Sequence, residues 1–258
     1  MIRLVFLLLF CGAAWSKPAT QSVLLYNDTT GHHLIQSNAD VVRPIASITK
    51  LMTAMVALDY DQDVTRPLKL IGKNRGVLPR GTWTRGEVLQ AMLVRSDNDA
   101  AETLAADYPG GRSAFLAAMN AKAALLDMPS ANFSDASGLD NRNVTTLIGV
   151  KRLLLASTAY PLIRSISVQK QALFDQRFKK KIRKIELLNT NKEMLFEFDS
   201  IVVTKTGLTT PAGWCLGMVV EHHGQKYVVV ILGARNKLER LKLAREIMYN
   251  NITDTDLR

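Results

Sequence analysis

The chain has 258 residues, of which 47% are hydrophobic and 22% are charged, and its 33 Lys and Arg outnumber its 23 Asp and Glu to give a net charge of +10. This is the composition of an ordinary globular protein, with enough chain for one large domain or two small ones. A basic protein favours polyanionic neighbours, such as cell-wall polymers or a membrane surface outside the cytoplasm. We expect no nucleic-acid partner.

Residues 1–16 differ in character from the rest of the chain. They begin with one positive charge, continue in an unbroken apolar run and end in small residues, which is the pattern of a secretory signal peptide cleaved after Ser16. A lipoprotein signal around Cys11 is the alternative, although the bulky Phe10 stands where such a signal has a small residue. No other apolar segment is long enough to span a bilayer. We therefore expect a periplasmic or secreted mature protein, residues 17–258, with no transmembrane anchor.

The first elements of the mature chain predict a strand pair followed by a buried helix. Residues 21–27 and 33–37 are typical of strands around a turn. In the following stretch Ser47 and Lys50 are three residues apart, so on a helix their side chains lie one turn apart on one face. The next residues are apolar almost all round, which predicts burial. The same spacing recurs in the polar residues 167–170, so chance is the alternative explanation for Ser47 and Lys50.

Burial gives this pair a chemical meaning. A buried ammonium is costly unless it is paired or neutralised, and the usual response is a lowered pKa. A partly neutral Lys50 can accept the proton of Ser47 and make its hydroxyl a nucleophile.

Several helices are expected next, in a helical lobe at about residues 60–165. Thr84 and Glu87 predict a capping box that opens a helix ending at about Val94. Thr145 is expected to cap a later helix. Between them the apolar spacing predicts helices at residues 100–107 and 115–126.

From about residue 174 the pattern changes to strands. Residues 201–207 predict one strand, and residues 214–221 and 227–232 predict a hairpin. A final amphipathic helix at residues 238–248 follows. Without residues 1–16, Cys215 is the one cysteine, which excludes an intramolecular disulfide and favours a buried, unreactive thiol. The basic run at residues 177–184 is interpreted as a solvated hairpin, with an anion-binding surface as the alternative.

Two further motifs carry possible chemistry. Ser96 and Asn98 fall where two predicted helices meet, so the serine can relay a proton and the amide can hold a substrate carbonyl. Lys205, Thr206 and Gly207 end a predicted strand, where the lysine and the hydroxyl can bind a carboxylate and glycine permits close approach to the backbone. Each motif is weak alone, because a serine-x-asparagine recurs elsewhere and a strand can end in a lysine that merely reaches solvent.

Together, in this order and context, the three motifs resemble the signature of penicillin-binding proteins and serine β-lactamases. The chain resembles most the D-alanyl-D-alanine endopeptidases and carboxypeptidases among the low-molecular-mass penicillin-binding proteins, especially the small endopeptidase type. The resemblance covers nearly the whole mature chain, and the matching stretches are residues 44–55, 93–101, 108–111, 119–123, 137–139, 189–191 and 205–215.

The resemblance implies acyl transfer without a metal or an organic cofactor. Ser47 would attack the carbonyl that follows a D-alanine, Lys50 would be the base, with its pKa lowered by burial and by the charge of Lys205, and Ser96 would pass the proton to the leaving amine. The backbone N–H groups of Ser47 and Leu208 would form the oxyanion hole. The substrate-binding residues that it implies are Asn98, Lys205, Thr206, Gly207 and Leu208.

The implied fold is α+β and β-lactamase/transpeptidase-like: a mainly antiparallel sheet flanked by helices, plus an all-helical lobe, in a single domain at residues 17–258. The first expectation is hydrolysis of D-alanine-containing cross-links by a monomer, with peptidoglycan peptides as substrates and β-lactams as covalent inhibitors. The alternatives are a carboxypeptidase, a class A-like β-lactamase in which Glu186 activates water, and a non-catalytic penicillin-recognising wall-binding protein. Leu208 and Trp214 stand where the family pattern has an aromatic residue and an arginine, which leaves substrate preference open.

Overall fold

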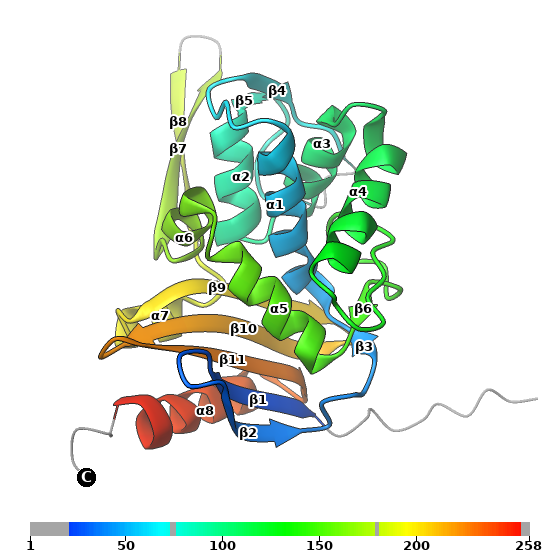
Figure 1. The fold of residues 1–258 in the computed structure, drawn as a ribbon. Coiled ribbons are helices and arrows are strands. Elements are labelled where there is room, and N and C mark those ends of the chain that lie inside the picture. The colour runs from blue at the N-terminus through cyan, green and yellow to red at the C-terminus, as the bar shows by residue number, and fades with distance from the viewer. Residues whose placement is uncertain (1–20, 73–75, 179–180, 254–258) are drawn as a thin grey trace, which may run out of the picture.

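The computed structural model describes residues 21–72, 76–178 and 181–253. The signal peptide expected at residues 1–16 therefore lies outside the described residues. The main sheet is antiparallel and joins both ends of the chain in the order β2-β1-β11-β10-β9 (Figure 1). Its strands are β1 (Ser22–Asn27), β2 (His32–Ser37), β9 (Ile201–Thr209), β10 (Gly213–His222) and β11 (Gln225–Ala234). The strands predicted at both ends of the chain are confirmed.

Alternation along the strands divides the core into two layers. Successive side chains of a strand point to opposite faces, and in β11 Val228 and Val230 belong to the core beneath the helical lobe whereas Val229 and Ile231 belong to the core on the other face. Helix α5 (Leu147–Ser157) packs on the first face and α8 (Lys237–Met248) on the second. Figure 1 shows α8 below the sheet and the lobe above it. Cys215 of β10 is buried and free, as predicted.

The lobe is mainly helical but also contains short strand pairs. Its helices are α1 (Thr49–Tyr60), α2 (Arg85–Val94), α3 (Asn98–Asp107), α4 (Gly111–Leu125) and α6 (Pro161–Ser167). The strand pairs are β4 (Pro67–Lys69) with β5 (Thr82–Thr84), and β3 (Arg43–Pro44) with β6 (Val144–Thr145). Strands of two or three residues leave no hydrophobic period to detect, so the sequence did not predict them.

The predicted helix caps are correct with one exception. Thr84 accepts the backbone N–H of Glu87 in a complete capping box at the start of α2. The sequence predicts Thr145 as the cap of α5, but Thr145 pairs in β6 and donates its hydroxyl to the carbonyl of Pro129. The following residue, Thr146, accepts the N–H of Gly149 and is the cap.

A buried arginine ties three lobe helices together. Arg85 at the start of α2 is 1% exposed; its Nη1 lies 2.7 Å from Oδ2 of Asp107 at the end of α3, and its Nη2 donates to the carbonyl of Ala57 in α1. A guanidinium so deeply buried depends on these partners.

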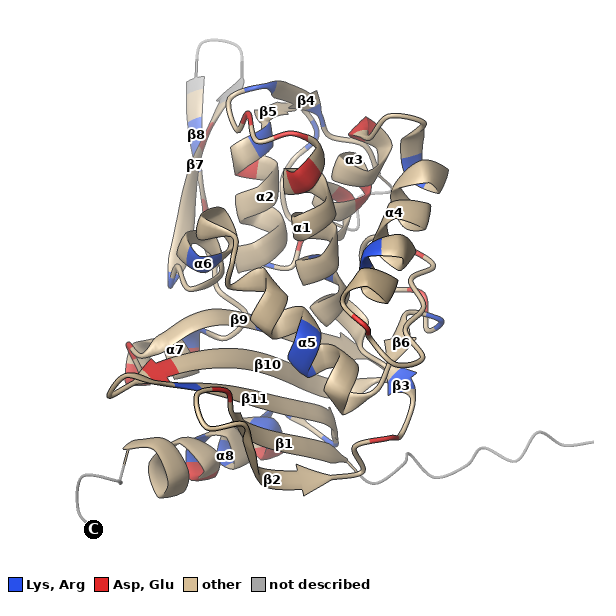
Figure 2. Ribbon diagram, in the orientation of Figure 1, with Lys and Arg blue, Asp and Glu red and all other residues tan. Residues whose placement is uncertain are grey.

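The remaining elements are a separate strand pair beside α2 of the lobe and short helices next to the main sheet (Figure 1). Strands β7 (Gln171–Phe178) and β8 (Lys181–Leu188) form the predicted hairpin across the basic run, and Arg183 and Lys184 are exposed on it. Helix α7 (Lys192–Glu197) leads into β9, and a short π-helix, η2 (Tyr249–Thr253), follows α8. Basic and acidic residues both occur along α8 (Figure 2). Within the described ranges, no helix is both long and apolar enough to cross a membrane.

Candidate active site

Ser47 and Lys50 meet at the start of the most buried helix. Ser47 lies in η1, a single 3-10 turn (Ala46–Ile48), and Lys50 lies in the first turn of α1. Lys50 has 0% exposure, and its Nζ lies 2.9 Å from Oγ of Ser47, 2.7 Å from Oδ1 of Asn98 and 2.5 Å from the carbonyl oxygen of Ser137. The predicted spacing is therefore realised as a direct hydrogen bond.

The partners of Lys50 fit a neutral amine. The oxygens of Asn98 and Ser137 only accept hydrogen bonds, whereas the hydroxyl of Ser47 can also donate. In the neutral amine two N–H groups would donate to Asn98 and Ser137 and the lone pair would accept the proton of Ser47, whereas the ammonium form donates to all three oxygens, Ser47 Oγ included. This arrangement is that of a nucleophile beside its general base.

Burial also lowers the pKa of Lys50 to about 7, against the opposing effect of Asp135, Asp97 and Glu102. The sequence predicts that the charge of Lys205 contributes to this lowering, and the repulsion between the two amines is seen in the pKa of Lys205 rather than in that of Lys50. The charge of Lys50 instead adds to burial in holding the pKa of Lys205 well below its ordinary value. The burial of Lys50 is thus the main reason why its pKa lies near neutral pH.

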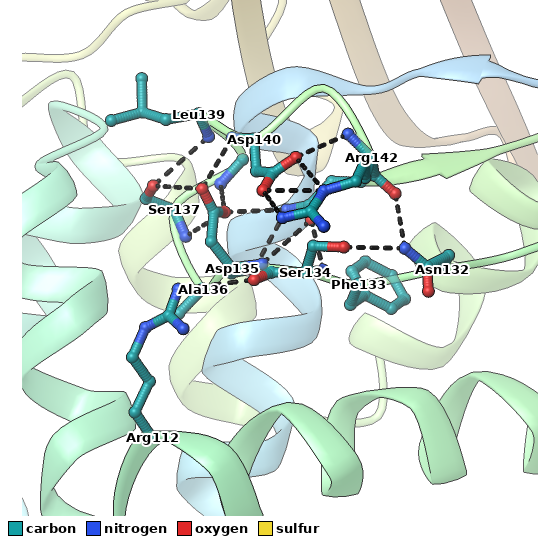
Figure 3. A network of polar contacts seen from close by, with 12 residues as sticks. Arg112, Asn132, Phe133, Ser134, Asp135, Ala136, Ser137, Leu139, Asp140 and Arg142 are labelled. Carbon is teal, nitrogen blue, oxygen red and sulfur yellow. Dashed lines mark hydrogen bonds and ion pairs between the residues drawn. The ribbon is translucent and has the colours of Figure 1, made fainter.

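A short loop after α4 presents the carbonyl that Lys50 contacts. The Asp135 carboxylate accepts the backbone N–H groups of Ser137 (3.0 Å), Gly138 (2.5 Å) and Asp140 (2.7 Å), as the network in Figure 3 illustrates. Asp135 itself is buried. These bonds fix the loop and so hold the Ser137 carbonyl against Lys50. The sequence analysis assigned no role to Asp135, because carboxylates in polar loops are common.

The backbone of Ser47 packs directly against Gly207 of the edge strand β9, where no side chain would fit between them. A Cβ on Gly207 would lie 2.9 Å from the backbone nitrogen of Ser47 and 3.0 Å from the carbonyl oxygen of Ile45. Ala46, immediately before Ser47, has a left-handed φ of 47°, which is uncommon and costly outside glycine. The backbone nitrogen of Ser47 therefore faces β9 just before Leu208, where the proposed oxyanion hole would lie.

The motif of Ser96 and Asn98 lies at the same pocket, in a turn where Ser96 has a left-handed backbone conformation. Ser96 has a φ of 65°, and Asn98 begins α3 after Asp97, whose side chain caps the helix by accepting the N–H of Ala100. Ser96 lines the pocket that contains Ser47. Among the described residues its hydroxyl has no hydrogen-bond partner, so its role as proton relay stays a prediction.

The strand motif splits into residues that line the pocket and one that lies behind it. Thr206, Gly207 and Leu208 line the pocket, and Leu208 is 49% exposed. Lys205 is 1% exposed, donates to the carbonyl of Thr206 and does not line the pocket. Thr206 Oγ1 lies 2.7 Å from Thr190 Oγ1. Thr206 is thus the polar side chain of this motif that lines the pocket, and the binding of substrate by Thr206 and Lys205 stays a prediction.

The structure adds a residue that the sequence analysis missed. Arg240 of α8 lines the same pocket, of about 340 Å³, and is 2% exposed. Its guanidinium carbon lies 5.6 Å from the centre of the Trp214 ring, and within the described part of the chain its Nε and Nη2 have no hydrogen-bond partner. An arginine on an amphipathic helix is ordinarily a surface residue, so its sequence position carried no signal. Two unpaired N–H groups in a pocket are suited to a carboxylate.

Comparison with known sequences identifies the family. The sequence model of the family described as D-alanyl-D-alanine carboxypeptidase matches residues 13–236. The chain belongs to this family of serine peptidases. Two curated relatives are each named D-alanyl-D-alanine endopeptidase. The one from Pseudomonas aeruginosa is 37% identical over 85% of this chain and 73% of its own length, and the one from Escherichia coli is 36% identical over 87% and 74%.

Solved structures agree with the family and confirm the predicted fold. Penicillin-binding protein D2 from Listeria monocytogenes, in its cefotaxime-bound form, is 29% identical with a TM-score of 0.76, over 88% of this chain and 94% of that one. A Streptomyces DD-transpeptidase is 23% identical with a TM-score of 0.81, over 88% and 94%, and supports the fold alone. The predicted α+β, transpeptidase-like architecture is therefore correct. Membership of the D-alanyl-D-alanine peptidase family indicates that the chemistry of this protein is peptide-bond hydrolysis by a serine.

Proposed function

We propose that this family member is a D-alanyl-D-alanine endopeptidase that hydrolyses D-alanine-containing cross-links of peptidoglycan through an acyl-enzyme on Ser47. The observation that carries the proposal is the 2.9 Å contact between Ser47 Oγ and the buried Nζ of Lys50, whose pKa lies at about 7. The two relatives named endopeptidase at 36–37% identity favour this activity within the family.

Acylation follows from the geometry of the pair. Lys50 Nζ takes the proton of Ser47, and Oγ attacks the carbonyl carbon of the D-alanine, which is bonded to the amine of the next residue. The N–H groups of Ser47 and Leu208 would donate hydrogen bonds to the carbonyl oxygen as negative charge develops on it, an interaction that is typically worth about a hundredfold or more in rate. Ser96 would deliver the proton to the leaving amine as the C–N bond breaks. Water, deprotonated by Lys50, then attacks the ester and regenerates the Ser47 hydroxyl.

The carboxylate beside the scissile bond would bind at the other end of the pocket. Thr206 and Arg240 present a hydroxyl and unpaired N–H groups there, and Lys205 lies buried behind them. Because the burial of Lys205 disfavours its charge, an arriving carboxylate would raise its pKa and bring it into the ion pair. Asn98 would position the peptide and hold Lys50 at the same time, since its Oδ1 contacts Nζ.

The carboxypeptidase is the second candidate, favoured by the description of the family and by a relative from Mycobacterium tuberculosis named D-alanyl-D-alanine carboxypeptidase at 28% identity. The structure does not favour the β-lactamase alternative, which needs Glu186 to activate water beside Ser47. Glu186 is exposed in β8 and does not line the pocket of Ser47. A non-catalytic wall-binding protein would not require a nucleophile in contact with a buried base.

Two further parts of the proposal concern setting and inhibitors. Residues 1–16 would direct export, and the mature chain would act as a monomer in the periplasm. β-Lactams would acylate Ser47, as the cefotaxime- and ampicillin-bound forms of the Listeria protein suggest by analogy.

The test is digestion of purified muropeptides. The mature protein is incubated with a cross-linked dimer and with an uncross-linked pentapeptide, and the products are separated and weighed by mass spectrometry. Release of monomers from the dimer supports the endopeptidase, and release of D-alanine alone supports the carboxypeptidase. The Ser47→Ala variant must be inactive on both, and residual activity in it would overturn the acyl-enzyme.

A further inference from the structure

The pocket around Ser47 is cationic beyond what one carboxylate requires. Its lining includes Arg95, Lys237 and Arg240, with Lys205 behind them, and no Asp or Glu among the described residues that line it. Arg240 and Lys205 lie deep, beside Thr206, and suffice for the carboxylate next to the scissile bond. Arg95 and Lys237 lie at the exposed part of the pocket and have no use in that step.

Arg95 is an arginine held at the mouth of the pocket without an ion pair. It is the C-cap residue of α2, directly before Ser96, and its side chain is exposed. Across the described part of the chain no carboxylate pairs with it, whereas most described arginines form ion pairs; these are Arg66, Arg85, Arg112, Arg142, Arg152, Arg164, Arg235 and Arg245. An unpaired guanidinium beside the nucleophile is available to an anionic ligand.

Lys237 supplies a second cation from the other side of the cleft. It is the first residue of α8, so it belongs to the sheet layer, whereas Arg95 belongs to the helical lobe. Its Nζ lies 2.6 Å from Oε1 of Glu193, which holds the side chain at the rim, and its side chain is 46% exposed. Lys237 has three N–H donors, so it can bind a ligand carboxylate while it keeps Glu193.

The leaving groups of the two candidate reactions, free D-alanine and a stem peptide, differ in the number of carboxylates that they carry. Trimming releases free D-alanine, which has one carboxylate. Cleavage of a cross-link releases an amine that is part of a whole stem peptide, and that peptide carries further carboxylates at a distance from the bond. We propose that Arg95 and Lys237 bind a second carboxylate on the leaving peptide, and so select cross-linked over terminal substrate. This rests on the endopeptidase activity proposed above.

The experiment compares two dimers that differ only in the charge of the distal carboxylates of the leaving peptide. One is a cross-linked muropeptide dimer; in the other the distal carboxylates of the leaving peptide are amidated and the carboxylate beside the scissile bond is kept. kcat/KM is measured for the unmodified protein, for R95Q/K237Q and for R183Q, a matched loss of an exposed arginine on β8 outside the pocket. Active enzyme is counted by titration with labelled penicillin, so loss of folded protein does not count as loss of specificity.

Amidation is expected to lower kcat/KM of the unmodified protein and of R183Q by about fivefold, mainly through KM, as for ion pairs at a solvated rim. R95Q/K237Q should cleave both dimers at equal rates. R95K, which keeps a cation at both positions, should retain part of the preference for the unamidated dimer. Equal cleavage of both dimers by the unmodified protein, or an undiminished preference in R95Q/K237Q, overturns the inference while leaving the endopeptidase intact. If the unmodified protein cleaves neither dimer, the proposed function itself has failed, and the inference with it.

Discussion

Acylation of Ser47 should depend on pH with an inflection near 7. The step needs a neutral Lys50, and burial lowers its pKa from 10.5 to about 7. At pH 7 an amine with the ordinary value would be neutral in about one molecule in 3,000, whereas here about half of the molecules have the base in its reactive form. Burial of one side chain thus raises the reactive fraction by about a thousandfold.

The assay is the second-order rate constant for labelling of Ser47 by a fluorescent penicillin, measured from pH 5.5 to 9 at constant ionic strength. Below the inflection the rate should rise about tenfold per pH unit and then level off above it. Lys50→Met should reduce labelling by about a thousandfold or more at every pH. A rate that is independent of pH between 6 and 8, or one that still rises tenfold per unit up to pH 9, would refute the neutral-lysine mechanism.

The charges around Lys50 give a second measurement of the same mechanism. Glu102 raises the pKa of Lys50, because a nearby carboxylate favours the ammonium. Glu102→Gln should therefore move the inflection to lower pH, so the rate below the inflection rises. Glu246→Gln, a similar change at an exposed site on α8 paired only with Lys242, should leave the inflection in place. A shift of the Glu102→Gln profile toward higher pH would contradict the assignment.

Three other variants test separate parts of the structure. Gly207→Ala places a Cβ against the backbone of Ser47, so labelling by penicillin should fall by the order of a hundredfold with the fold retained by circular dichroism; an unchanged rate would show that the close approach is unnecessary. Arg240→Gln should raise KM for a D-alanine-terminated peptide more than it lowers kcat in steady-state assays, and the reverse split would argue against carboxylate binding. Asp107→Ala removes the nearer of two carboxylates beside the buried Arg85, the other being Asp61 at 3.9 Å, and also a partner of Arg66. It should lower the free energy of unfolding in urea by about 3 kcal/mol, whereas a loss below about 1 kcal/mol would mean that Asp61 suffices for Arg85.

The contact between Ser47 and Lys50 could be predicted because its geometry is local. Ser47 and Lys50 are separated by one helical turn, so spacing alone places them together once the apolar residues after them predict a buried helix. The hairpin of β10 and β11 was predictable for the same reason, since its pattern and its turn are adjacent in the chain. The three motifs lie far apart in sequence, and their meeting in one pocket followed from the family resemblance.

Other parts of the site depend on contacts that no local pattern contains. Arg240 is polar in a helix that reads as amphipathic, and its burial arises only when α8 packs beneath the sheet next to Trp214. Only helices were predicted in the lobe, and β4 and β5 were not, because these two strands pair over three residues each. The left-handed backbone of Ser96 is similarly invisible in sequence, since nothing distinguishes it from the many serines in ordinary turns.

The same buried charges that make the site reactive make it costly to fold. Lys50 and Lys205 lie fully buried, and Arg240 has N–H groups without partners among the described residues, each of which costs about 1–3 kcal/mol when left unsatisfied. A protein selected only for stability would replace such groups by apolar ones of similar size. Arg240 lines a pocket that has no acidic residue among its described lining, and Lys205 lies behind it, so the presence of both is explained if an anionic peptide supplies the missing partner during turnover. The stability lost by burying these cations without partners would then be recovered as affinity when the substrate carboxylate binds. In the chemical step, burial has a different effect, because it lowers the pKa of Lys50 and makes this amine a base near neutral pH.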